Sequence, residues 1–159
     1  MKKNINEIKI IANNKRATYD YEIISKFEAG IVLLGSEVKS LRLSKCSINE
    51  SYIDKTNNNE IELINASISE YKNAYITQHN ERRNRKLLLH QTEINKIIVA
   101  ISKKGLTAIP LKIYFKNGKI KLEIAIAKGK TNYNKKHSLK EKDIQKEHKK
   151  SFKEFNLKL

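Results

Sequence analysis

Alternating apolar and polar positions recur through the first 129 residues and predict a series of short β-strands. Alternation, or a short apolar run between polar turns, is typical of strands in antiparallel sheets. The predicted strands are 17–27, 31–34, 51–55, 60–69, 86–90, 106–116 and 119–128. Residues 28–30 and 56–59 are predicted turns, and Asn117-Gly118 is a dipeptide preferred in tight type I′ hairpins.

Two segments have helical patterns instead. Residues 92–104 carry isoleucines at the spacing of one helix face, with Thr92 as a candidate N-cap. Gly105 follows at the position where a left-handed C-terminal residue is preferred. A shorter helix is predicted over residues 37–43, with Ser36 as its N-cap.

Many short strands and one long helix exclude a parallel α/β fold and predict a mainly β protein with a few helices. A closed barrel removes exposed strand edges, and an oligonucleotide-binding (OB-like) antiparallel barrel has about this size with a helix between strands. A split sheet packed on the helix would give the same pattern, so the sequence leaves both architectures open.

Residues 130–159 differ in composition from the rest of the chain. They contain ten lysines, four acidic residues and no Gly or Pro, a net charge of +6 that leaves +10 on residues 1–129. Such a segment buries too little apolar surface to fold alone, so we expect a disordered basic tail that orders against a polyanion. The predicted organisation is a partly ordered lead-in over 1–14, a barrel over 15–129 and this tail, which has a helical capping pattern at 138–141.

The overall charge of +16 favours a nucleic acid or an anionic membrane as the partner. No apolar run approaches the ~20 residues of a membrane span, and the N-terminal residues do not resemble a signal peptide. Cys46 is the only cysteine, which fits a reducing compartment. We therefore expect a cytoplasmic RNA-binding protein without a membrane partner.

Candidate catalytic chemistry is sparse. The four histidines lack metal-ligand spacing, the acids are dispersed, and no nucleotide-binding or hydrolase motif is present. The sequence therefore predicts no enzyme, no metal and no cofactor. A cryptic nuclease that uses Glu37 or Asp20 is kept as an alternative.

Cations gather most densely at residues 82–86, where Arg82, Arg83, Arg85 and Lys86 surround one asparagine. Like charges this close repel unless an anion is near, which favours phosphate contact over a solvated loop. Lys112, Tyr114 and Lys116 share a predicted outer strand face, either for RNA or to protect an edge. Glu37 is interpreted as a helix-dipole partner or as an acceptor for base or ribose donors.

Six motifs in order resemble the SsrA-binding protein (SmpB) family, which partners transfer-messenger RNA in ribosome rescue. They are residues 14–17 (NKRA), 27–33 (FEAGIVL), 35–42 (GSEVKSLR), 85–90 (RKLLLH), 104–107 (KGLT) and 110–118 (PLKIYFKNG). The chain departs from the family at Ser36 (usually Thr), Glu81 (often Pro), Asn134 (Asp) and Lys136 (Arg).

The resemblance implies a non-enzymatic protein whose barrel binds the tRNA-like domain of transfer-messenger RNA and delivers it to stalled ribosomes. The tail would probe the empty messenger channel next to the small-subunit decoding centre, becoming helical there. Elongation factor Tu and alanyl-tRNA synthetase are implied as further partners through the RNA.

The implied RNA-binding residues combine this surface with the cationic positions above: Asn14, Lys15, Arg16, Glu37, Lys39, Arg42, Arg83, Arg85, Lys86, Leu88, Lys112, Tyr114 and Lys116. The implied ribosome-binding residues of the tail are Lys130, Tyr133, Asn134, Lys135, Lys136, Lys140, Ile144 and Phe152. The alternative is a generic single-stranded RNA-binding or ribosome-associated protein with the same barrel.

Overall fold

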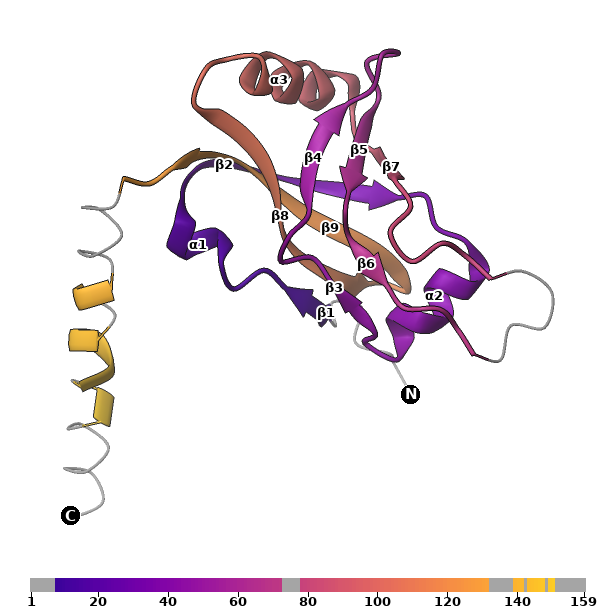
Figure 1. Cartoon of the computed structure of the whole chain (residues 1–159), viewed down its shortest axis with the longest axis horizontal. Coiled ribbons are helices and arrows are strands. Elements are labelled where there is room, and N and C mark those ends of the chain that lie inside the picture. Colours follow the sequence, from indigo (N-terminus) through magenta and orange to yellow (C-terminus); the bar gives the residue numbers. More distant parts are fainter. Residues whose placement is uncertain (1–7, 73–77, 132–138, 142, 148, 151–159) are drawn as a thin grey trace. The chain divides into compact units, whose positions relative to one another are not determined.

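The computed structural model describes residues 8–72, 78–131, 139–141, 143–147 and 149–150 of the chain (Figure 1). Residues 1–129 and 130–159 form two separate compact units. The first unit contains the elements β1 (Ile8–Asn13), α1 (Ala17–Asp20), β2 (Tyr21–Ile31), α2 (Gly35–Arg42), β3 (Cys46–Ser47), β4 (Tyr52–Lys55), β5 (Ile61–Ile64), β6 (Ser67–Ile68), β7 (Arg85–Leu88), α3 (Gln91–Ile101), β8 (Leu106–Lys116) and β9 (Lys119–Gly129).

The main sheet closes on itself and confirms the predicted antiparallel barrel. Its strand order is β1-β8-β4-β5-β7-β2-β9, and β9 pairs again with β8. Every pairing is antiparallel, and β3 and β6 form a separate small ladder. A split sheet would lack the pairings that complete this ring, so the alternative architecture is excluded.

The interior of the ring is aliphatic. Leu63, Ile113 and Leu122 have no exposed surface, and Ile97 of α3 packs against the same core. Figure 1 shows α3 at one end of the barrel and α2 at another. A smaller apolar cluster around Ile109 and Ala127 packs under α1. Burial of these side chains, each worth about 1.5–3 kcal/mol, is the main source of stability for the barrel.

The β8–β9 hairpin has the predicted geometry. Asn117 and Gly118 both have positive φ values, 51° and 74°, as a type I′ turn requires. Gly105 is also left-handed, with a φ of 86°, in the turn that follows α3. The predicted hairpin between β4 and β5 is present as well, closed by Thr56 and Glu60.

The predicted strand 60–69 is divided into β5 and β6, which belong to different sheets. Four further local predictions are wrong. Residues 8–13 are a strand paired with β8 and not a lead-in outside the barrel, while residues 17–20 are a helical turn and not the start of a strand. No turn interrupts β2 at residues 28–30, since Gly30 pairs with both Lys121 of β9 and Leu88 of β7. A Cβ at Gly30 would lie 3.2 Å from the Leu88 Cβ, so this glycine permits close strand approach.

The fourth correction concerns the helix N-caps. Leu34 and His90 occupy the cap positions of α2 and α3, where Ser36 and Thr92 were expected. Neither cap donates or accepts through its side chain; instead an acid in the first turn of each helix accepts the cap backbone N–H. These acids also complement the positive end of the helix dipole.

The tail unit is helical over its described residues 139–141, 143–147 and 149–150. All of these residues are exposed, including Leu139 and Ile144 at 42% and 53%. None of the described helical residues of this unit is buried. None of the described helices is long and apolar enough to cross a membrane.

Candidate nucleic-acid interface

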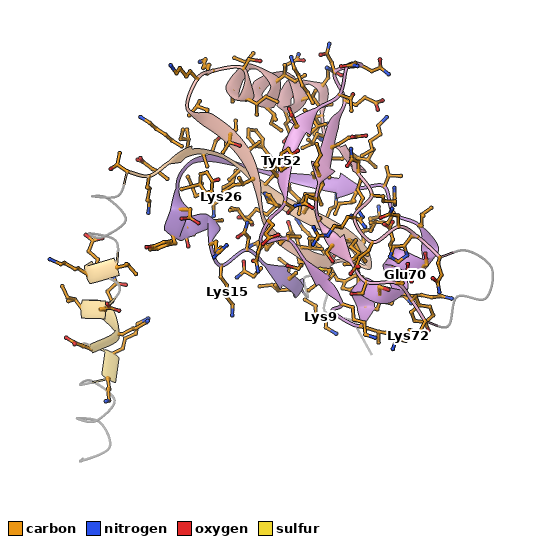
Figure 2. The ribbon with its side chains drawn as sticks, viewed as in Figure 1. Lys9, Lys15, Lys26, Tyr52, Glu70 and Lys72 are labelled. Carbon is orange, nitrogen blue, oxygen red and sulfur yellow. The ribbon has the colours of Figure 1, made fainter. Side chains whose placement is uncertain are left out.

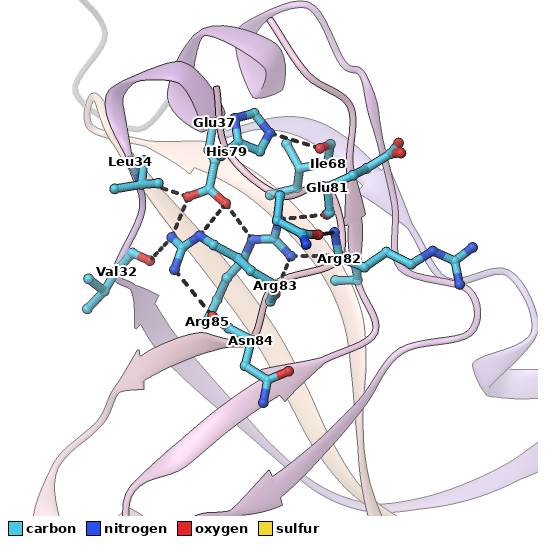
Figure 3. Close-up of polar contacts among 12 residues, drawn as sticks. Val32, Leu34, Glu37, Ile68, His79, Glu81, Arg82, Arg83, Asn84 and Arg85 are labelled. Carbon is cyan, nitrogen blue, oxygen red and sulfur yellow. Dashed lines mark hydrogen bonds and ion pairs between the residues drawn. The ribbon is translucent and has the colours of Figure 1, made fainter. Parts of the chain in front are cut away.

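One buried carboxylate joins the start of α2 to the cationic segment 82–86 (Figure 3). Glu37 lies in the first turn of α2 and has no exposed surface. Its Oε2 accepts the Leu34 backbone N–H at 2.7 Å and Arg83 Nη2 at 2.5 Å. Its Oε1 accepts the Nε groups of Arg83 and Arg85, each at 2.9 Å. Four donors therefore satisfy this carboxylate from within the chain.

The pKa of Glu37 follows from these partners. Burial by itself would raise the pKa of this carboxyl group, but the hydrogen bonds from Arg83 and the Leu34 backbone and the charge of Arg85 outweigh it. The net effect holds the pKa below the ordinary value of a glutamate. Glu37 is therefore the internal anion that compensates two of the clustered arginines.

Arg85 is a structural residue of the interior. Its side chain is fully buried, and besides Glu37 it donates to three backbone carbonyls: Ala66 at 2.7 Å, Arg83 at 2.9 Å and Glu81 at 2.9 Å. Glu37 and Arg85 are thus both buried with their charged groups bonded inside the chain, and their RNA contacts stay a prediction. Both residues hold the loop before β7 in place.

Arg83 is held by the same cluster at the surface. Its side chain keeps 28% of its exposure, and Nη2 and Nη1 donate to the carbonyls of Val32 and Asn84, both at 3.2 Å. A guanidinium fixed in this way loses little rotamer entropy when it binds a further acceptor. Arg83 is therefore the best-positioned cation of the predicted site.

The other cations of this segment are exposed. Arg82 donates to Asn65 at 3.2 Å, and Lys86 pairs with Glu60 on the outer face of the barrel. Leu88, two residues further along β7, is 53% exposed. It lines a hollow of about 430 Å³ with Gly30, Ile31, Leu33, Ile120 and two lysines, Lys119 and Lys121. Lys86 and Leu88 thus lie on the outer face of β7, directly after Arg82 and Arg83 in the preceding loop.

Residues 14–16 divide between structure and surface. Asn14 is buried, donates to the carbonyl of Pro110 at 3.0 Å and accepts the Ala17 N–H at 3.1 Å. Its RNA contact stays a prediction. Lys15 and Arg16 are exposed, and Lys15 projects away from the barrel in Figure 2. Asn14 therefore sets the turn that presents the two cations.

The hairpin face of β8 differs from its prediction. Tyr114 is only 4% exposed and donates its hydroxyl to Glu28 at 2.5 Å, so it does not lie on a wet face. Burial and the Glu28 hydrogen bond both raise the pKa of Tyr114. Lys116 pairs with Glu28 at 2.8 Å, and Lys112 pairs with Glu123 at 2.7 Å. Carboxylates from neighbouring strands thus neutralise this face.

Lys39 and Arg42 extend from the exposed side of α2. The Lys39 ammonium lies 5.3 Å from the ring centre of Tyr71, and Arg42 borders a hollow of about 540 Å³ with Ile8, Lys9 and Phe115. The sequence analysis missed Val32 and Leu34, which are 44% and 46% exposed next to Arg83. The sequence carries no signal for this exposure, because residues 31–34 are all apolar and their alternating burial is set by the fold.

The tail residues are only partly described. Lys130 is half-buried, and Lys140 and Ile144 are exposed on helical turns. Tyr133, Asn134, Lys135, Lys136 and Phe152 lie outside the described residues. Within the described part of the chain, no group of three or more His, Cys, Asp or Glu side chains is arranged to hold a metal ion.

Comparison with known proteins places this geometry in a family. The family model described as SmpB protein matches residues 11–154. The SsrA-binding protein of Sulfurihydrogenibium sp. (strain YO3AOP1) is 51% identical over 145 residues, which cover 91% of this chain and 95% of the relative. The chain belongs to the SmpB family. The SsrA-binding protein of Lachnoclostridium phytofermentans is 47% identical and covers 94% of this chain and 97% of its own length.

A solved structure agrees with this SmpB assignment. It is described as "tmRNA-SmpB: a journey to the center of the bacterial ribosome" and superposes with a TM-score of 0.63 at 41% identity. The superposition covers 76% of this chain and 84% of the other. Glu37, Arg83 and Arg85 lie within the span that the SmpB family model matches.

Proposed function

We propose that this chain binds transfer-messenger RNA and delivers it to stalled ribosomes for rescue by trans-translation. The observation that carries the proposal is the family match over residues 11–154, because it spans both the barrel and most of the basic tail. The SmpB relatives are named as binders of this RNA, and the solved neighbour is described at the ribosome. The chain would act in the cytoplasm, and the proposal assigns it no catalytic step.

The barrel surface around Arg83 would contact the tRNA-like domain of the RNA. Arg83 is pre-positioned, while Lys15, Arg16 and Lys86 offer exposed cations to phosphates. Leu88 offers apolar surface to a base or ribose. Glu37 and Arg85 would act as positioning residues that hold Arg83 without touching RNA. Lys39 and Arg42 would extend the cationic surface along α2.

The tail would enter the empty messenger channel of the small subunit and order there. Residues 130–159 would span ~45 Å as a helix, enough to follow a channel past the decoding centre. The residues proposed to contact the ribosome are Lys130, Tyr133, Asn134, Lys135, Lys136, Lys140, Ile144 and Phe152. Elongation factor Tu and alanyl-tRNA synthetase would associate with this chain indirectly, by binding the same RNA.

One experiment separates this function from generic RNA binding. The full chain and a version ending at Gly129 are tested for binding to transfer-messenger RNA in competition with random RNA, and for peptide tagging on stalled ribosomes. We expect both versions to prefer transfer-messenger RNA and only the full chain to support tagging. Equal affinity for random RNA would favour the generic alternative, and tagging by the truncated chain would contradict the role of the tail.

The barrel surface is tested by Arg83→Ala. Loss of a fixed, charged donor is worth about 1.5–3 kcal/mol, so affinity for transfer-messenger RNA should fall about 10- to 100-fold. Lys104→Ala, an exposed lysine between α3 and β8, is the matched control and should bind like the parent chain. Equal affinities of the two variants would remove Arg83 from the interface.

A further inference from the structure

An apolar groove lies on a part of the barrel that the proposed RNA contacts do not use. It has a volume of about 380 Å³ and lies between α3 and strands β2, β8 and β9. Its apolar lining includes Ile24, Val99, Leu106 and Ile126, and Lys96 and Lys103 border it. The proposed RNA-binding residues of the barrel do not line it, so the proposed function leaves this groove without a role.

A β-bulge exposes the isoleucine on the strand side of the groove. In the ladder with β9, Ile23 pairs with Ala127 and Ser25 pairs with Ile126, so Ile24 is the extra residue of β2. Ile24 is 56% exposed although it lies in the middle of a long strand. Bulges commonly redirect a side chain, and this one places a large apolar side chain on the surface.

Helix α3 contributes the opposite wall. Its core face carries Ile97, which is fully buried, but Val99 is 56% exposed on another face. Lys96 and Val99 are three residues apart on one face of α3, and Lys103, in the turn after the helix, lines the same groove. Both lysines are exposed, and neither has an ion pair within the part of the chain that the structure describes.

We propose that this groove binds a short amphipathic helix of another protein, apolar on one face and acidic along its flanks. Aliphatic walls suit leucine-like anchors, and no described lining residue is aromatic, so the groove offers no stacking platform for bases. The rim lysines favour carboxylates over the basic segment 130–159. A second copy of the chain is a poorer occupant, because its own Lys96 and Lys103 would face these lysines and repel them.

The groove is tested with the full chain labelled at its isoleucine, leucine and valine methyl groups. The probe is a synthetic peptide of about 16 residues with leucines at helical spacing and glutamates elsewhere. A scrambled peptide of equal composition and a peptide with lysines in place of glutamates are the controls. We expect shifts in the methyl spectra of Ile24, Val99, Leu106 and Ile126, and at least tenfold tighter binding than to either control peptide.

Variants separate the groove from general attraction to a basic protein. Val99→Asp should lower the affinity for the glutamate peptide at least tenfold. Ile8→Asp changes an isoleucine of 54% exposure outside the groove, and this variant should bind the peptide with the parent's affinity. The double change Lys96→Glu and Lys103→Glu should reverse the preference toward the lysine peptide. Circular dichroism of each variant checks the fold, and the two lysines are exposed enough to be changed without loss of core.

Several outcomes would overturn the proposal. Equal binding of the scrambled peptide, or methyl shifts away from the groove, would reduce the effect to nonspecific charge attraction. Concentration-dependent shifts of the same methyl groups without peptide would assign the groove to a second copy. If an RNA oligonucleotide displaces the peptide and shifts the same methyl signals, the groove would be assigned to RNA.

Discussion

The carboxylate of Glu37 receives four hydrogen bonds without any exposed surface, and two of its partners are arginines 46 and 48 residues away. The charge of Glu37 therefore has two roles. It neutralises the fully buried guanidinium of Arg85, and it fixes the partly exposed guanidinium of Arg83. Stability of the barrel and presentation of Arg83 depend on the same side chain.

Glu37→Gln should lower the free energy of unfolding by about 3–5 kcal/mol. The amide keeps the size of the side chain but leaves Arg85 buried without an anion, and breaking a buried ion pair on one side has about this cost. Urea unfolding followed by circular dichroism measures the change. Glu60→Gln breaks the exposed pair with Lys86 and should cost less than about 1 kcal/mol. Equal costs would mean that the Glu37 charge contributes no more than a surface pair.

Acid should remove the same contribution in the parent chain. The pKa of Glu37 is lowered in the folded state, so its stabilisation is fully present above the unfolded pKa of about 4.3 and is lost as the pH falls through the folded value. Urea midpoints measured from pH 7 to pH 2 should therefore fall less in Glu37→Gln than in the parent. Parallel curves for the two chains would contradict this assignment.

The sequence predicted a cationic site at residues 82–86, but it did not predict that Arg85 and Glu37 are buried. Residues 85–88 alternate buried and exposed, so the buried position of Arg85 follows once the strand is extended by one residue from the predicted 86–90. The burial of Glu37 has no local signal, because its partners are brought to it by the fold. Asn14 is similar, since its acceptor carbonyl belongs to Pro110.

At the element scale, the β8–β9 hairpin depends on its left-handed turn. Gly118→Ala should destabilise the barrel by about 1–2 kcal/mol, because a Cβ is strained at a φ of 74° even though no atom lies within 4 Å of it. Thermal unfolding measures this cost. Gly35→Ala, equally free of neighbours and without a positive φ, is the control and should be neutral or slightly stabilising. Destabilisation by Gly35→Ala but not by Gly118→Ala would show that the positive φ of Gly118 is not the source of the cost.

Elements with strong local patterns were predictable, and those set by packing were not. The helix α3 and the Asn117-Gly118 hairpin follow from periodicity and turn chemistry. The continuous strand β2 was predicted as two strands with a turn, because a Gly next to Glu and Ala is typical of turns. In the fold, Gly30 instead lets β2 pair with β7 and β9 at the same residue.

At the scale of the whole molecule, the positive charge is divided between two units. Residues 130–159 carry +6 and residues 1–129 carry +10. For random single-stranded RNA, the slope of log affinity against log salt should be shallower in the chain ending at Gly129, by up to about 4. Fluorescence anisotropy across a salt series measures both slopes. Equal slopes would mean that the tail makes no phosphate contacts in nonspecific complexes.

The sequence could predict a closed barrel as the favoured fold, but not the order of its strands. Antiparallel strands without a parallel crossover favoured a barrel, but the order β8-β4-β5-β7-β2-β9 depends on pairings between distant segments. β1 is the clearest example, since residues 8–13 have a weak strand pattern of their own. They become a strand because β8 offers them a partner from Lys112 to Lys116.

The strand that leads into the tail has a mechanical consequence. β9 ends at Gly129 and is hydrogen-bonded along its length to β2 on one side and to β8 on the other. A pull on the tail along the direction of β9 would load both ladders in shear, so many bonds would have to break together. Tension on residues 130–159 would therefore pass into the barrel through both ladders and would not peel β9 away.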